Sequence, residues 1–511
     1  SGIFEIREHI DEVATSRGVD TGVVMYGATL PDGLEVNQTE WATMRVQAAE
    51  DFVTNRAPIL VATKSFGMGI DKPNIRYTIH YGMPPSIEAF AQESGRAGRD
   101  GKDSFCYLIH TMPNSEEDVE ALLDVNRKFD ERERDKDERN ARYIDSDIDH
   151  QLYFHYNSFK GAQTEAKFTT NFFRELRDQA RRGPGENFKI PQGNWPRGKS
   201  SEAVAGQREK ALYRLYLLGL VDDYVLEGMS PYNGKFVITL ADYDAARIDK
   251  ALENFAAGIE PGRGDALRAE IALAPADLDA RCEHHIEKLL SILYRNIEPA
   301  RIQALRAMYN LTLGDLGSEA IKARINAYLG QGLLASTLVS TITDNEDRVP
   351  AEAFVAALGV MPFATEDERQ GATDGQLADT PTHPIALLAS SMTQALLREG
   401  NRDVFKNLLS RAFVSFSEYV PDDHEAQQVV EWLLGQVRTI DDARHAEWCS
   451  DIWQAWPADR AEALRALEDA VLEQGYSGNA PELQAVLERR LAALAENGQD
   501  LVLAETASRT Q

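Results

Sequence analysis

Two arginines near residue 100 have the chemistry and spacing of a phosphate-binding site. Arg96 and Arg99 lie at the end of a predicted helix in the stretch QESGRAGRDG, which begins with Gln92. Side chains three apart share a helix face, and Gly95 and Gly98 let a backbone or a phosphate approach closely. Guanidinium groups pair with phosphate oxygens in two-point geometry and stabilise charge on a transferring phosphoryl group. The alternative interpretation is a surface helix with two solvated arginines.

A glycine-bearing turn lies upstream of this helix. The stretch VATKSFGMGIDKPNI predicts a buried strand ending at Thr63, then a turn through Gly67 and Gly69 to Asp71. Open α/β sheets bind ligands at such strand ends. The Asp71 carboxylate can accept a hydrogen bond from a ribose hydroxyl, and backbone N–H groups near Thr63 can contact a nucleic-acid phosphate.

The spacing of these two stretches closely resembles motifs V and VI of RecQ-type superfamily 2 DNA helicases. The shared residues follow the pattern FGMGI.KP..R..IH...P.SIE...QE.GRAGRDG from Phe66 to Gly101. Upstream, YGATL resembles the family's YHAGL, with Gly27 in place of the histidine, and Phe52 lies at the expected distance before VAT. The resemblance covers about residues 3 to 112.

The resemblance implies a role for each matching residue. Arg99 would be the arginine finger on the γ-phosphate of ATP, with Arg96 in the same interface. Gln92 would couple the nucleotide to the partner lobe. The residues implied near the nucleotide are Gly69 and Asp71, and those implied at the DNA backbone are Thr63 and Lys64.

The first RecA-like lobe of such a helicase carries a phosphate-cradling GxxxxGK[ST] loop and a magnesium-binding DExH box. We expect neither element anywhere in this chain, and the strand expected before residue 3 is absent as well. We therefore expect the chain to be part of a larger protein and to be inactive in ATP hydrolysis by itself. Its partner would be the missing N-terminal RecA-like lobe, which would bind most of the ATP and Mg²⁺.

The predicted elements divide the chain into an α/β RecA-like parallel-sheet lobe, a winged-helix-like unit and a mostly α-helical C-terminal region. We expect the lobe over residues 1–112 and a charged connector, either a solvated helix or mobile, over 113–150. The winged-helix-like unit would span 151–245 and the acidic helical region 246–511, with a break near 342–384. Within that break, TEDERQGATDGQLADTPTHP is interpreted as a loop.

The accessory unit has features of a DNA-binding domain. Basic and aromatic residues interleave over residues 164–200, which suits backbone pairing and base stacking. Alternatively, Phe172 and Phe173 are core residues and the basic side chains are solvated. The DNA-binding candidates are Arg181, Arg182, Lys199 and, at the tip of the predicted wing, Tyr232.

Cysteine and charge content exclude other classes of site. Cys106, Cys282 and Cys449 are too far apart for a disulfide framework or for the four-cysteine zinc domain usual in RecQ proteins. In CEHH, His284 and His285 point different ways around a helix and lack a fourth ligand, so we expect no zinc and no other metal site. The chain has a net charge of -28, and residues 251–511 hold 41 acidic and 22 basic residues. That acidity favours a protein partner for the helical tail.

We therefore predict the C-terminal part of an ATP-dependent 3'-to-5' DNA helicase acting on single-stranded or forked DNA in repair, recombination or defence against foreign DNA. The alternatives are a non-catalytic scaffold built on a degenerate lobe, and an RNA-remodelling helicase. With no run of 18 apolar residues and no signal peptide, we expect a cytoplasmic protein, at the nucleoid in a bacterium, without a membrane partner.

Overall fold

The chain forms two compact units in a computed structural model. Unit 1 comprises Ser1–Pro84 and Glu88–His110, and unit 2 comprises Pro85–Ile87 and Thr111–Gln511. The structure describes residues 2–19, 22–31, 33–67, 72–125, 127–140, 146–180, 185, 187–193, 201–228, 234–259, 264–314, 316–397, 400–438, 445–473 and 480–496.

Unit 1 alternates helices and short parallel strands, as expected. Its elements are α1 (Ile3–Ser16), β1 (Val23–Tyr26), α2 (Gln38–Val53), β2 (Ile59–Ala62), η1 (Lys64–Gly67), β3 (Tyr77–Tyr81), α3 (Ile87–Ser94) and β4 (Phe105–Ile109). β1 pairs with β2 and β3 pairs with β4, both parallel. Within the described residues these strands form two separate pairs, whereas the sequence predicted one sheet.

Local sequence explains where α2 begins and which face it buries. The Asn37 side chain accepts hydrogen bonds from the N–H groups of Thr39 and Glu40, and the Glu40 side chain accepts one from Asn37 N. This capping box satisfies donors that the first turn leaves unpaired. Trp41 and Phe52 then bury the inner face of the helix.

In its described part, the predicted charged connector, residues 113–150, forms two helices and the start of a third in unit 2. These are α4 (Glu116–Leu123), α5 (Phe129–Asn140) and α6 (Asp147–Ser158), and α4 and α6 contact the long helix α11 (Leu278–Thr312). Val119, Leu122 and Leu123 are fully buried, and so is the guanidinium of Arg132. The segment is helical, one of the two alternatives expected, but it is not simply solvated, because the apolar face of α4 and the ion pair of Arg132 are buried.

A small antiparallel sheet follows. The elements are α7 (Ala162–Gln179), β5 (Asn187–Pro191), α8 (Ser201–Leu217), β6 (Val221–Glu227), β7 (Lys235–Leu240), α9 (Ala245–Ala257) and α10 (Gly264–Ala272). The sheet order is β5-β7-β6, and Phe172, Phe173, Leu212 and Leu215 lie in the core that joins it to α7 and α8. The predicted helix and hairpin around Gly219 therefore exist.

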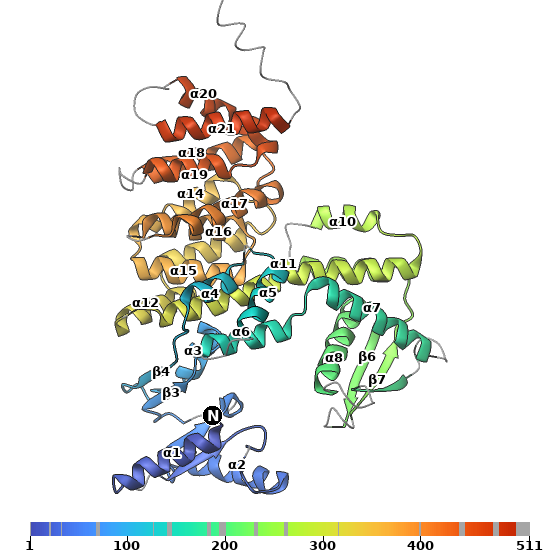
Figure 1. The fold of residues 1–511 in the computed structure, drawn as a ribbon, viewed down its shortest axis with the longest axis vertical. Helices are drawn as coiled ribbons and strands as arrows, with labels where there is room; N and C mark the ends of the chain where they lie inside the picture. The colour runs from blue at the N-terminus through green and yellow to red at the C-terminus, as the bar shows by residue number, and fades with distance from the viewer. Residues whose placement is uncertain are drawn as a thin grey trace, which may run out of the picture. The chain divides into compact units, whose positions relative to one another are not determined.

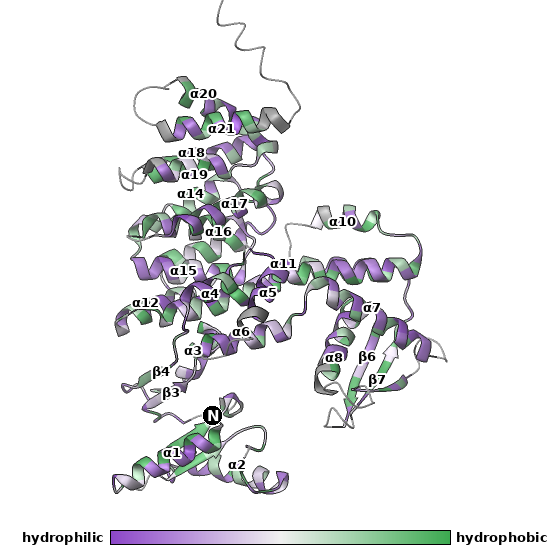
Figure 2. Cartoon of the chain, viewed as in Figure 1, coloured by the Kyte–Doolittle hydropathy of each residue, from purple (hydrophilic) through white to green (hydrophobic). Residues whose placement is uncertain are grey.

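The rest of unit 2 is helical, as the sequence predicted. It consists of α12 (Ser318–Tyr328), α13 (Leu333–Asp344), α14 (Ala351–Leu358), η3 (Met361–Phe363), α15 (Glu366–Asp379), α16 (Pro384–Leu396), α17 (Arg402–Tyr419), α18 (Asp423–Arg438), α19 (His445–Ala455), η4 (Ala458–Leu464), α20 (Arg465–Glu473) and α21 (Ala480–Glu496). Figure 1 shows these helices stacked in successive layers. Figure 2 shows hydrophobic and hydrophilic residues mixed along them, as expected for helices with one buried stripe.

Residues 366–379 correct one sequence interpretation. They form α15, whereas the sequence was interpreted as a loop from residue 365 to 384. A capping box between Thr365 and Glu368 starts the helix, and Gly371 and Gly375 are buried against α12. These glycines allow close packing and do not break the helix.

Among the described residues, no helix is both long enough and apolar enough to cross a membrane.

Candidate functional site

Helix α3 and the loop after it carry the three candidate catalytic residues. Gly95 N donates a hydrogen bond to Ala91 O at 2.9 Å, which extends the helical turn toward Arg96. Gln92 and Arg99 are exposed, and Arg96 is half-buried. The three side chains therefore lie within one short stretch at the surface of unit 1, where their catalytic roles stay predictions.

Arg76 fixes the far side of this loop. Its guanidinium pairs with the Asp100 carboxylate and donates from Nη1 to the carbonyl oxygens of Lys102 at 3.3 Å and Asp103 at 3.2 Å. The hydrogen bond with Arg76 holds the pKa of Asp100 below its ordinary value. Because Asp100 directly follows Arg99, this clamp sets the path of the backbone that presents Arg99.

Gly98 is required at the centre of the loop. Its φ is +70°, a left-handed conformation that side chains disfavour. Its N–H donates to Ile75 O at 3.0 Å. A Cβ atom at this position would lie 2.7 Å from Ser104 Oγ and 3.0 Å from Lys102 O. Only glycine therefore fits between the two halves of the loop.

The Glu93 carboxylate interacts with three basic side chains, those of His80, Lys64 and Arg96. Its hydrogen bond with His80 lowers the pKa of Glu93, and Lys64 and Arg96 lower it further through electrostatic attraction. The structure thus brings Lys64, a candidate for DNA binding, and Arg96, a candidate catalytic residue, near one carboxylate. Sequence reasoning assigned no role to Glu93 or His80, although both stand in the quoted motif.

The candidates Thr63 and Lys64 are exposed at the end of β2. Thr63 N donates to Tyr26 O at 3.0 Å, which aligns the ends of β1 and β2. Arg45 Nη1 donates to Gly27 O at 3.1 Å and to Ala28 O at 3.2 Å, and so holds the chain as it leaves β1. These hydrogen bonds fix the C-terminal ends of β1 and β2 relative to each other.

Gly69 and Asp71, the candidates for nucleotide contact, lie outside the described residues. The segment immediately after them is well anchored. Lys72 Nζ donates to Asn55 Oδ1 at 2.5 Å and lies 4.8 Å from the centre of the Phe52 ring, and its burial lowers the pKa of Lys72. This contact ties the segment to the end of α2, a role that no sequence motif indicated.

The accessory-unit candidates Arg181, Arg182, Lys199 and Tyr232 also lie outside the described residues. Basic side chains near them are engaged in ion pairs, which are Arg174 with Glu283, Arg177 with Asp279 and Lys189 with Glu227. Phe172 and Phe173 are buried, so their interpretation as core residues is confirmed.

A GxxxxGK[ST] pattern does occur in this unit, at residues 193–200 (GNWPRGKS), between β5 and α8. It corrects the expectation that the pattern is absent from this chain. In helicases the loop joins a parallel strand to a helix, whereas β5 pairs antiparallel with β7. Residues 194–200 lie outside the described part of the chain, and the pattern alone assigns no ATP site here.

Two residues of the CEHH stretch are buried and pack within unit 2. Cys282 and His285 are buried in α11, and His285 Nε2 lies 2.9 Å from Asp249 Oδ1. Within the described residues, no group of three or more histidine, cysteine, aspartate or glutamate side chains is arranged to hold a metal ion.

The N-terminal part of the chain is similar to known helicases. Residues 41–101 match the helicase conserved C-terminal domain. RecQ-like DNA helicase blm-1 of Caenorhabditis elegans is 39% identical over 108 residues, covering 21% of this chain and 10% of that protein. The probable ATP-dependent DNA helicase RecS of Bacillus subtilis is 41% identical over 110 residues, covering 20% and 22% of the two chains. The chain carries a RecQ-like helicase C-terminal region.

The RecQ-like resemblance of motifs V and VI is thereby confirmed, and with it the assignment of a RecA-like lobe. A putative ATP-dependent RNA helicase of Acanthamoeba polyphaga mimivirus is also similar, at 42% identity over 94 residues, 16% of this chain and 17% of that protein. The matched region spans between about a tenth and a fifth of the length of these three relatives.

Proposed function

We propose that this chain supplies the second motor lobe of an ATP-dependent RecQ-like DNA helicase or translocase with 3'-to-5' polarity. The observation that carries the proposal is the loop after α3. Gly98 and the Arg76–Asp100 pair fix its backbone, while Arg99 stays exposed. A loop held in this way presents a guanidinium without losing much conformational entropy when a phosphate binds.

In the proposed motor, Arg99 stabilises the negative charge that develops on the γ-phosphate, and Arg96 supports it from the same interface. ATP would lie between this lobe and a first lobe that holds most of the nucleotide and Mg²⁺. Gln92, four residues before Arg96, would link the nucleotide to movement of the first lobe. Closing the lobes around ATP changes their grip on DNA and so couples hydrolysis to translocation.

DNA would contact both units. Thr63 and Lys64 are proposed to meet the DNA backbone at the end of β2. The elements from α7 to β7 have the order of a winged helix, and we propose that they form an accessory DNA-binding unit. Its candidate contacts are Arg181, Arg182 and Lys199 for phosphates and Tyr232 for stacking on a base.

The acidic helical region is proposed to recruit a protein partner or to regulate the motor. The process would be DNA repair, recombination or defence against foreign DNA in the cytoplasm. A pull-down comparing the whole chain with one lacking residues 250–511 tests this role, and unchanged interactions and activity would contradict it.

The deciding experiment measures DNA-stimulated ATP hydrolysis by the longest parent chain, including any sequence before Ser1. Arg99→Ala should lower turnover by roughly a thousandfold or more while DNA binding is retained, because an arginine finger acts on the transition state. Arg56→Ala is the matched control, since Arg56 is an exposed arginine of the same unit whose side chain pairs with Glu50 and Asp51. Equal turnover in all three proteins would contradict the proposed role of Arg99.

RNA remodelling is the second candidate, because one similar protein is named an RNA helicase. Comparing single-stranded DNA and RNA as activators of hydrolysis separates the two functions. No hydrolysis with either nucleic acid would favour a non-catalytic scaffold.

The proposed accessory DNA-binding unit has its own test. A Lys199→Ala variant should weaken DNA binding and reduce the salt dependence of that binding, while hydrolysis at saturating DNA stays unchanged.

A further inference from the structure

A pocket in unit 2 lies far from the motor residues in the sequence. It has a volume of about 760 Å³ and is lined mainly by α17, with contributions from α11, the segment after α4 and the start of α16. Small-molecule sites typically have volumes of about 300–1,000 Å³. The pocket therefore has the size of a site for a small organic ligand.

Cationic side chains gather in the pocket, in a region that is acidic as a whole. Three cations, Arg295, Lys406 and Arg411, line it together with Asp403 and Glu418, and Lys406 Nζ also lies 3.8 Å from Asp451 Oδ1. The region from 251 to 511 as a whole has nearly twice as many acidic as basic residues. Clustered cations in an acidic domain favour a small anion over an extended polyanion such as nucleic acid, which the surrounding charge would repel.

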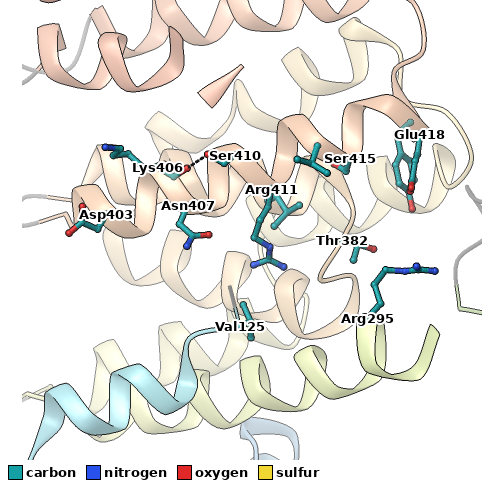
Figure 3. A pocket seen from close by; sticks show the side chains of 13 residues that line it. Val125, Arg295, Thr382, Asp403, Lys406, Asn407, Ser410, Arg411, Ser415 and Glu418 are labelled. Carbon is teal, nitrogen blue, oxygen red and sulfur yellow. Dashed lines mark hydrogen bonds between the residues drawn. The ribbon is translucent and has the colours of Figure 1, made fainter. Parts of the chain in front are cut away.

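Arg411 has an unused donor in this pocket. Its Nη2 donates to Pro381 O at 2.8 Å, whereas its Nη1 atom is buried and has no hydrogen-bond partner within the described residues. Figure 3 shows the side chain pointing from α17 across the pocket toward Val125. A buried guanidinium nitrogen without an acceptor is costly. An anionic oxygen in the pocket would supply that acceptor.

Burial lowers the pKa of Arg411 to about 10, with attraction from Asp124 opposing the shift. The group is therefore still protonated at neutral pH, and it can pair with an oxyanion.

The remaining walls fit the rest of such a ligand. Thr382, Asn407 and Ser410 offer polar groups, and Ser410 Oγ donates its own hydrogen to Lys406 O at 2.9 Å, which leaves its lone pairs for an incoming donor. Val414 and Leu387 add apolar surface. A molecule with a charged end and a less polar body matches this lining.

We propose that this pocket binds a small organic phosphate, with a phosphate oxygen accepting from Arg411 Nη1 and the uncharged part of the molecule against Val414 and Leu387. Phosphate is favoured over a single carboxylate because it offers more oxygens to the several cations and matches the guanidinium fork. The site is independent of the proposed motor function.

Thermal unfolding and calorimetric titration of the whole 511-residue chain test the proposal. The probes are ADP, pyrophosphate, citrate and adenosine at matched ionic strength. ADP or pyrophosphate should raise the Tm by roughly 2 °C or more in a concentration-dependent way. Arg411→Met should weaken this binding roughly tenfold to a hundredfold, because a charge-assisted hydrogen bond is lost. Without ligand, its Tm should equal or exceed that of the parent, since an incompletely paired buried charge is removed.

Two matched variants locate the binding. Arg348→Met makes the same chemical change at an arginine whose side chain is 59% exposed, and it should keep the full response. Arg99→Ala should also keep it, which separates this pocket from the motor lobe. Should Arg411→Met fail to fold, Arg411→Lys replaces it, and it should bind pyrophosphate more weakly than the parent because the fork is lost.

The proposal is overturned if neither phosphate compound binds the parent chain, if citrate binds and both phosphates do not, or if the Arg411 variants respond like the parent.

Discussion

His80 Nε2, in β3, lies 3.2 Å from Glu93 Oε2, in the helix that carries Gln92 and leads into the loop of Arg96. Burial alone would lower the pKa of His80, but its hydrogen bonds with Cys106 and Glu93 outweigh burial and raise the pKa to about 9. The pair is therefore charged at neutral pH and holds α3 against β3. This contact links strand β3 to the candidate ATP-binding face.

The first prediction is a loss of stability in alkaline solution. An unfolded histidine has a pKa of about 6.5, so His80 is protonated in both states below that pH and its stabilisation is complete there. Between pH 6.5 and about 9 the folded state binds the extra proton, so stability falls by about 3 kcal/mol as pH rises. His80→Gln should remove this slope, while substitution of the exposed His9 should not. An NMR titration that gives the His80 ring a pKa of 6.5 or lower would rule the prediction out.

The second prediction concerns the shape of the arginine loop. Gly98→Ala should reduce DNA-stimulated hydrolysis by the longer chain at least tenfold, because its Cβ would approach Lys102 O at 3.0 Å and Ser104 Oγ at 2.7 Å. Gly101 also has a positive φ, +75°, but a Cβ there meets no atom within 4 Å. Gly101→Ala should thus cost only about 1 kcal/mol of local stability and keep most activity. Equal hydrolysis by the two variants would show that the loop tolerates a shift.

The third prediction tests a buried ion pair of unit 2. Glu298 accepts from Arg132 Nη1 at 2.9 Å and Nη2 at 2.8 Å, and its Oε1 lies 2.8 Å from His155 Nε2. Burial lowers the pKa of His155, so the neutral ring donates from Nε2. Glu298→Gln should destabilise the protein by about 3–5 kcal/mol in urea unfolding, because it leaves the Arg132 charge buried without a counterion.

A double variant and a surface control complete this test. Arg132→Met with Glu298→Met should recover much of the lost stability, because no charge then remains buried. Glu283→Gln removes a partner from the exposed Arg174 pair, and it should cost no more than about 1 kcal/mol. A double variant as unstable as Glu298→Gln would contradict the prediction.

The same ion pair shows what sequence could not predict. The stretch from 129 to 140 is so rich in charge that it favours a solvated helix, yet Arg132 points inward. Its partner Glu298 is 166 residues away, and no periodicity within either helix marks the two as a pair. Motifs V and VI could be predicted from the sequence because each consists of residues that are close together in the chain. The strands and α3 were predicted from short apolar runs and helical spacing, whereas the separation into two strand pairs depends on contacts across the unit.

Helix α15 was not predicted either, because its stability also depends on a contact with a distant part of the chain. Gly371 and Gly375 fall in the stretch 365–384 that the sequence favours as a loop, but they lie four apart in α15 and so share the face that meets α12. The energy of that contact is tertiary and leaves no local signal beyond the spacing of the two glycines.

The contact supports a fourth prediction. A Cβ at 371 would lie 2.3 Å from Arg324 O, and one at 375 would lie 2.4 Å from Tyr328 O. Because these neighbours are backbone atoms, α12 must move away, and each alanine substitution should destabilise unit 2 by about 1–3 kcal/mol or more. Gly435→Ala in α18 is the control, since its Cβ meets no atom within 4 Å and alanine should add up to about 1 kcal/mol of helix stability. Urea unfolding followed by circular dichroism measures all three, and a stabilising effect at 371 or 375 would mean that α12 and α15 are not packed this closely.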